Sequence, residues 1–248
     1  MKKNKLFPLI IITVLILQSC SYSDSATDVG SESGTGGSMA RFTIVNDKLY
    51  TVDNEYMAVF DISTEESPEH QLTISVGWGV ETIFPLGNKL FLGTSNGMFI
   101  YDISNEGEPE KISFYQHVIA CDPVVSDGDF AFVTLSNTRQ GCWRSVNELQ
   151  IIDIQNIQQP KLLRQYSMTN PRGLAIRNDT LWLCDDGLKI FDVSDKQNIK
   201  SLYHFNDLAA YDIILDKSRA LVIGESGFVQ YKLENDTIKK LSEIQINN

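Results

Sequence analysis

MFIYDIS, residues 98–104, is one of five copies of a short motif that decide the fold of this chain. The Asp of the motif recurs at intervals of 41, 51 and 39 residues, and after 40 more Lys232 takes its place in the last copy. The copies are MAVFDIS (57–63), MFIYDIS (98–104), LQIIDIQ (149–155), LKIFDVS (188–194) and FVQYKLE (228–234). A fixed period of about 40 residues indicates a repeat architecture.

Each copy lies in a unit of four short apolar or alternating runs, separated by Asn, Asp, Gly, Ser and Pro. In the second unit the runs are ETIFPL (81–86), NKLFLG (88–93), MFIYDIS (98–104) and EKISFY (110–115). They are too short for helices and rich in Val, Ile, Leu, Phe and Tyr, which predicts strands. Four strands in a unit of about 40 residues are typical of a propeller blade. We therefore predict an all-β fold, a β-propeller of five four-stranded blades over residues 40–248.

The Asp of the motif has a structural explanation. Its carboxylate can accept backbone N–H bonds in the turn after the strand, with the following Ser helping. Four carboxylates at the same turn of successive blades favour this role over a role as ligands; they are Asp61, Asp102, Asp153 and Asp192. Seven residues later a Pro follows in the first three units, where it suits the first residue of a strand. These residues are Pro68, Pro109 and Pro160.

The motif resembles that of the LVIVD-repeat family, most clearly in LQIIDIQNIQQP and MFIYDISNEGEP. The resemblance covers about residues 41–246 and departs in the last unit at Lys232 and Lys239. It implies a β-propeller in a bacterial surface or secreted protein, and it implies no single activity. The sequence leaves two closures open: five self-contained blades, or a ring closed by residues 241–246 against the first blade.

The first 20 residues read as an export signal. Lys2, Lys3 and Lys5 precede an apolar run over residues 6–17, which is too short for a comfortable membrane span. The sequence LQSC (17–20) resembles the lipobox of bacterial lipoproteins, which implies acylation of Cys20 and anchoring in a membrane. We expect a signal peptide over 1–20, a flexible acidic Ser/Gly tether over 21–39, and a location in the cell envelope at the outer membrane or cell surface.

The charge of the chain excludes one class of partner. Loss of Lys2, Lys3 and Lys5 with the signal would change the net charge from −11 to −14. Acidic proteins are repelled by phosphate backbones, so we expect no nucleic acid partner. No nucleotide-binding motif, nucleophile elbow or metal-ligand spacing is present in the sequence, so we predict no catalytic residues, no cofactor and no metal.

Two regions carry the candidate binding residues. The longest spacing, 51 residues, contains an insert in the third blade, SNTRQGCWRSVN (136–147), whose Trp flanked by Arg is typical of binding hot spots; the residues are Arg139, Trp143 and Arg144. The starts of the first strands should meet at one mouth of the central channel. There the candidates are Trp78, Glu81, Asp122, Arg172, Tyr211 and Asp212.

The cysteines suggest how the insert could be held. Export permits disulfides, and a Cys121–Cys142 bridge would pin the insert to its blade. The alternative is a Cys142–Cys184 bridge between blades three and four; otherwise Cys184 is a buried strand residue.

The function predicted first is a surface-anchored binding or scaffold module for a protein or glycan. The alternative is an extracytoplasmic enzyme or small-ligand receptor with its site in the channel.

Overall fold

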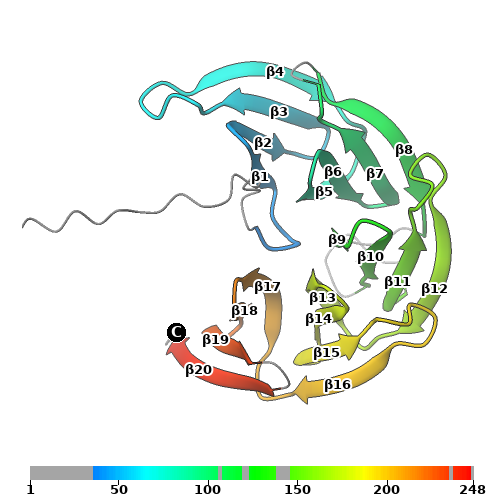
Figure 1. Ribbon diagram of the computed structural model, residues 1–248, viewed down its shortest axis with the longest axis vertical. Helices are drawn as coiled ribbons and strands as arrows, with labels where there is room; N and C mark the ends of the chain where they lie inside the picture. Colours follow the sequence, from blue (N-terminus) through cyan, green and yellow to red (C-terminus); the bar gives the residue numbers. More distant parts are fainter. Residues whose placement is uncertain (1–35, 106–107, 119–122, 138–145, 235–236, 247–248) are drawn as a thin grey trace, which may run out of the picture. The chain divides into compact units, whose positions relative to one another are not determined.

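The computed structural model describes residues 36–105, 108–118, 123–137, 146–234 and 237–246, without the side chains of 233 and 234. All of them belong to one compact unit, residues 31–248. They form twenty strands in five four-stranded antiparallel sheets, which confirms the prediction of an all-β propeller with five blades (Figure 1). Among the described residues, no helix has the length and apolar character needed to cross a membrane.

Each blade is built from one continuous stretch of sequence. Blade 1 consists of β1 (Phe42–Val45), β2 (Lys48–Val52), β3 (Tyr56–Asp61) and β4 (Glu69–Ser75). Blade 2 consists of β5 (Val80–Leu86), β6 (Lys89–Thr94), β7 (Gly97–Asp102) and β8 (Glu110–Gln116). Blade 3 consists of β9 (Val124–Ser126), β10 (Phe130–Leu135), β11 (Glu148–Asp153) and β12 (Lys161–Ser167). Blade 4 consists of β13 (Pro171–Arg177), β14 (Thr180–Asp185), β15 (Leu188–Asp192) and β16 (Lys200–Phe205). Blade 5 consists of β17 (Ala210–Asp216), β18 (Arg219–Gly224), β19 (Gly227–Glu234) and β20 (Thr237–Gln245).

The first strand of each blade lies innermost. Contacts run from β1 to β5, from β5 to β9, from β9 to β13 and from β13 to β17, as Figure 1 also shows. The last strand, β20, pairs with β19 inside blade 5 and not with blade 1. The closure in which residues 241–246 complete the first blade is therefore not the one observed.

The repeated Asp ends its strand as the sequence predicts. Asp61 accepts the Ser63 N–H at 2.9 Å and Asp102 accepts the Ser104 N–H at 2.7 Å, and both Ser hydroxyls donate to the same carboxylates. The sequence reading missed the cross-strand partners, Lys48 at 3.2 Å from Asp61 and Lys89 at 3.0 Å from Asp102. The Pro residues stand one position earlier than predicted, directly before the outer strands β4, β8 and β12.

These turns should make the thermal stability of the fold depend on pH in the acidic range. Hydrogen bonds from Ser63 and Ser104, and from the two lysines, lower the pKa of Asp61 and of Asp102 to about 2. The pKa of an Asp side chain in the unfolded chain is about 3.9. The stabilisation from the two ionised carboxylates is therefore fully present above pH ~4 and is lost as the pH falls toward 2. We expect Asp61→Asn and Asp102→Asn to lower the thermal midpoint at pH 7 but hardly at pH 2. A difference from wild type that stays constant over this range would contradict the assignment.

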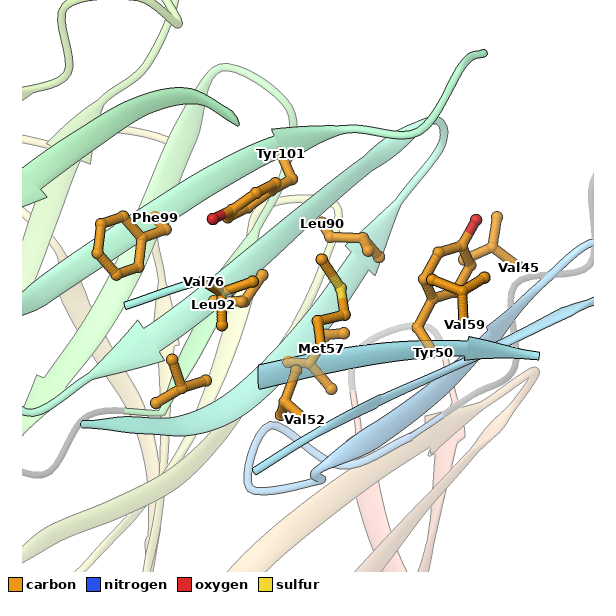
Figure 2. Close-up of a cluster of buried hydrophobic side chains, with 12 residues drawn as sticks. Val45, Tyr50, Val52, Met57, Val59, Val76, Leu90, Leu92, Phe99 and Tyr101 are labelled. Atoms are coloured by element: carbon orange, nitrogen blue, oxygen red, sulfur yellow. The ribbon is translucent and has the colours of Figure 1, made fainter. Parts of the chain in front are cut away.

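Four clusters of buried apolar side chains join neighbouring blades. Between blades 1 and 2, Met57 of β3 packs against Leu90 and Leu92 of β6, and all three are fully buried (Figure 2). The alternating side chains of each motif strand thus cover the sheet faces, which a single blade could not do alone.

Candidate binding site at the channel mouth

Three predicted mouth residues lie at irregular starts of inner strands. Glu81 is the extra residue of a bulge in β5, and Tyr211 is the extra residue of a bulge in β17. Arg172 lies in the register shift of β13. Bulges redirect a side chain away from the normal alternation and are frequent beside functional sites. The same device therefore recurs at the mouth in three blades.

Blades 4 and 5 bring two of these residues together. The Arg172 guanidinium lies 4.4 Å from the centre of the Tyr211 ring, a cation–π contact. Both line a hollow of about 200 Å³. Its other polar side chains are two amides and two exposed carboxylates, from Asn170, Asn206, Asp186 and Glu225. The sequence reading missed these four because they lie in turns and links that carry no motif.

Asp212, predicted as a mouth residue, holds the N-terminal segment instead of facing the hollow. Its carboxylate accepts the Ser38 hydroxyl at 3.0 Å and the Met39 N–H at 3.2 Å. The Ser38 oxygen in turn accepts the Leu174 N–H at 2.8 Å, and Ser38 is only 1% exposed. Burial raises the pKa of Asp212 above its ordinary value, although these hydrogen bonds favour the charged form.

We call residues 36–40 the strap. Its Ala40 carbonyl accepts the Ile83 N–H of β5 at 2.9 Å, so the strap links blades 2, 4 and 5 near the channel. It also lines a second hollow, of about 230 Å³, together with inner-strand residues such as Phe84, Val125 and Ile213. The sequence predicts residues 36–39 as part of the flexible tether, and in the structure they belong to the folded unit.

A substitution in the strap tests this contact. A Cβ on Gly37 would lie 2.1 Å from the Asp212 Oδ2 atom, whereas a Cβ on Gly36 would meet its nearest atom at 3.5 Å. We expect Gly37→Ala to lower the free energy of unfolding by about 1–3 kcal/mol, because the carboxylate has to leave its hydrogen bonds. Urea unfolding and limited proteolysis would measure this, with Gly36→Ala as the control. Equal effects of the two substitutions on the free energy of unfolding would contradict the close contact between Gly37 and the Asp212 carboxylate.

A second carboxylate, Asp185, holds the link between blades 3 and 4 at Thr169 and Asn170. Its side chain is completely buried, pairs with the Lys189 ammonium at 2.7 Å and accepts the Thr169 N–H at 2.9 Å. It also accepts the N–H of Asn170, a residue of the hollow. The Asn147 amide, at the base of the insert, donates to the Thr169 carbonyl at 2.7 Å. The C-terminal end of the insert therefore contacts Thr169, which precedes Asn170 of the hollow.

Trp78 and Glu81 do not line the hollow. Trp78 is 69% exposed on a link between Gly77 and Gly79, and Glu81 is half-buried and makes its own polar contact. The described residues thus place Arg172 and Tyr211 together and leave Trp78 as a separate exposed aromatic.

Several predicted residues lie outside the described part of the chain: Cys20, Cys121, Asp122, Arg139, Cys142, Trp143 and Arg144. Cys184 is a free and fully buried thiol, so the Cys142–Cys184 bridge is not formed. Burial, together with the negative charge of Asp212, raises its pKa, which keeps it unreactive. Within the described ranges, no group of three or more His, Cys, Asp or Glu is placed to hold a metal ion.

Comparison with known proteins supports the fold. No family model matches the chain, and no curated protein matches it. Among solved structures, it is similar to a protein from Lactobacillus plantarum with a TM-score of 0.61 and 13% identity, covering 81% of this chain and 73% of that one. It is also similar to the Pseudomonas aeruginosa periplasmic gluconolactonase, with a TM-score of 0.60 and 14% identity, covering 83% and 68% of the two chains. At such low identity these likenesses show that the chain has the β-propeller fold.

Proposed function

We propose that this chain is an envelope lipoprotein of the LVIVD-repeat type that binds a glycan or protein ligand at the channel mouth. Acylation of Cys20 would anchor it at the outer membrane or cell surface. The hollow around the Arg172–Tyr211 pair carries the proposal. The insert at residues 136–147 would extend this surface, because Asn147 at its C-terminal end donates a hydrogen bond to the carbonyl of Thr169, next to Asn170 of the hollow.

The size and lining of the hollow favour a small part of a larger ligand. About 200 Å³ is less than the ~300–1,000 Å³ of sites that enclose drug-sized molecules, and it suits one sugar ring or one side chain. The amides of Asn170 and Asn206 offer both donors and acceptors, and the carboxylates of Asp186 and Glu225 accept from hydroxyl groups. Tyr211 adds an aromatic surface.

The structure gives no specific support to the enzyme alternative. Both oxygens of the buried carboxylate Asp212 accept hydrogen bonds from the strap. A general acid or base has to reach a substrate proton directly, and the strap stands in the way of Asp212. Binding is therefore the function that the described geometry favours.

Binding to an oligosaccharide array tests the proposal. We expect the full chain to bind at least one neutral or acidic oligosaccharide. If the ligand is instead an envelope protein, we expect that protein to bind through the channel mouth that carries Arg172 and Tyr211. Arg172→Ala and Tyr211→Ala should each weaken that binding about 10- to 30-fold, as loss of a hot-spot residue does. Leu202→Ala, an exposed residue of the blade 4 outer strand, is the control. Binding that survives both substitutions unchanged would place the site elsewhere.

A further inference from the structure

The second strand of blade 1 places a hydroxyl group where blades 2–4 have none. Two residues after the start of the second strand, blades 2–4 carry a large side chain that packs toward the next blade and is at most 2% exposed; these are Phe91, Phe132 and Trp182. The residue at this place in blade 1 is Tyr50, which is 6% exposed. In the part of the chain that the structure describes, no group hydrogen-bonds to its hydroxyl. A buried hydroxyl in this position costs free energy unless water or a ligand pairs with it.

The outer strand of blade 1 differs from the other blades at a second position. Every outer strand has a bulge two residues after the cross-strand partner of the motif Asp, or of Lys232 in blade 5. The extra residue of the bulge is apolar in blades 2–5; these are Ile112, Leu163, Leu202 and Leu241. In blade 1 it is Gln71, whose Oε1 atom accepts the Lys48 ammonium at 2.7 Å and whose amide donates to Asp61 at 3.1 Å. Blade 1 therefore departs from the repeat toward polar side chains twice.

Tyr50 and Gln71 line the same groove between blades 1 and 2. Its volume is about 820 Å³, within the ~300–1,000 Å³ of small-molecule sites. The groove includes the turns that follow the first strands β1 and β5, so it lies at the opposite end of the blades from the channel mouth. The buried Val45 and Val59 form apolar parts of its lining, and Figure 2 shows the Tyr50 hydroxyl pointing toward Val45.

The polar lining of the groove is close to neutral and rich in amides. Four amide side chains line it, from Asn46, Gln71, Asn88 and Asn105. The Lys48 ammonium lies 3.2 Å from the Asp61 carboxylate, so the two charges offset each other. The third charged lining residue, Asp47, is exposed in the turn after β1. Amides both donate and accept hydrogen bonds, whereas a site for an anion needs an excess of positive charge.

We propose that this groove binds a neutral oligosaccharide, at a site separate from the channel mouth. Sugar hydroxyl groups both donate and accept, so they match the amides and the Asp47 carboxylate. The C–H faces of the sugar rings pack on Val45 and Val59, and Tyr50 donates its unpaired hydroxyl to a sugar oxygen. The groove is larger than the hollow of about 200 Å³ at the mouth, so it holds more than one ring.

Titration with neutral oligosaccharides tests this proposal. The probes are oligomers of glucose, mannose and N-acetylglucosamine, and the protein is the full chain carrying Cys20→Ser, which cannot be acylated. We expect at least one oligomer to bind in calorimetry and to shift the backbone amide signals of Gly87 and Asn88, which line the groove. Tyr50→Phe should weaken this binding about 3- to 10-fold, as loss of one hydrogen bond does. Gln71→Leu, which installs the residue type of blades 3–5, should weaken it at least as much.

Two matched substitutions in other blades are the controls. Tyr231→Phe removes the hydroxyl from another buried tyrosine, 2% exposed and outside the groove, and should leave binding unchanged. Asn46→Gly should weaken binding, whereas Asn178→Gly should not. Both Asn residues are exposed in the turn after the first strand, with φ of 53° and 51°, so Gly suits each turn equally and only Asn46 lines the groove.

Three results would overturn the proposal. The first is that none of the oligomers binds at millimolar concentration. The second is that binding survives Tyr50→Phe, Gln71→Leu and Asn46→Gly unchanged. The third is that Arg172→Ala abolishes the same binding, which would place the oligosaccharide at the channel mouth and leave the proposed function standing without this groove. Equal thermal midpoints of the variants and the parent chain would show that a loss of binding does not come from unfolding.

Discussion

Replacing Trp182 with alanine is expected to lower the free energy of unfolding by about 3–5 kcal/mol. Among the described residues, Trp182 is the largest fully buried side chain, 2% exposed, and it belongs to the cluster that joins blades 4 and 5. Its loss removes apolar contacts from both blades and leaves a cavity that strands fixed by ladder hydrogen bonds cannot easily fill. Because Cys184 and Leu188 belong to the same cluster, the β14–β15 hairpin, whose turn lines the hollow, should loosen as well.

Trp78 provides a matched control for this experiment. It is the same residue type but 69% exposed, so Trp78→Ala should change the free energy of unfolding by no more than about 0.5 kcal/mol. Urea unfolding followed by circular dichroism would measure both variants. A small effect of Trp182→Ala, or similar effects at the two positions, would mean that blades 4 and 5 do not share this core.

Replacing Asp185 with alanine should cost about 3 kcal/mol and disturb the binding site together with the fold. The substitution leaves the Lys189 ammonium and the N–H groups of Thr169 and Asn170 without their acceptor. Breaking a buried ion pair from one side costs about 3–5 kcal/mol. Lys189 is 20% exposed and can partly recover its hydration, which favours the lower end of that range.

The measurement for Asp185→Ala joins urea unfolding with amide hydrogen exchange. Exchange should accelerate at Thr169 and Asn170, because their N–H groups lose the carboxylate. Asp186→Asn is the control, since Asp186 is exposed in the same turn and Asn tolerates its positive φ of 49°. If exchange at these two amides stays slow while stability falls, the carboxylate does not hold the link that enters the hollow.

The candidate site could be predicted only in part. Arg172 and Tyr211 were found because each stands at the start of an inner strand, a position that the repeat fixes. The same reasoning selected Asp212 for the mouth, and the structure turns it toward the strap. Asn206 and Glu225 were missed, because links and hairpin turns vary between units and carry no periodic signal.

The sequence by itself determined the strands, their order and the blades. Alternating apolar residues, turn residues and the Asp–Ser turn act over a few residues, so each unit specifies its own hairpins and repeats the result five times. Asp61 with Ser63 is one such local device, two residues apart.

Only the tertiary structure decided the contacts that no periodicity records. Ser38 and Asp212 are 174 residues apart in the chain, and their hydrogen bond depends on how four intervening blades are placed. Phe42 and Ile83 hold the same place in the repeat, and one is 60% exposed while the other is 1% exposed. Burial depends on whether another blade lies in front of that face, and this is a property of the assembled ring and not of any single unit.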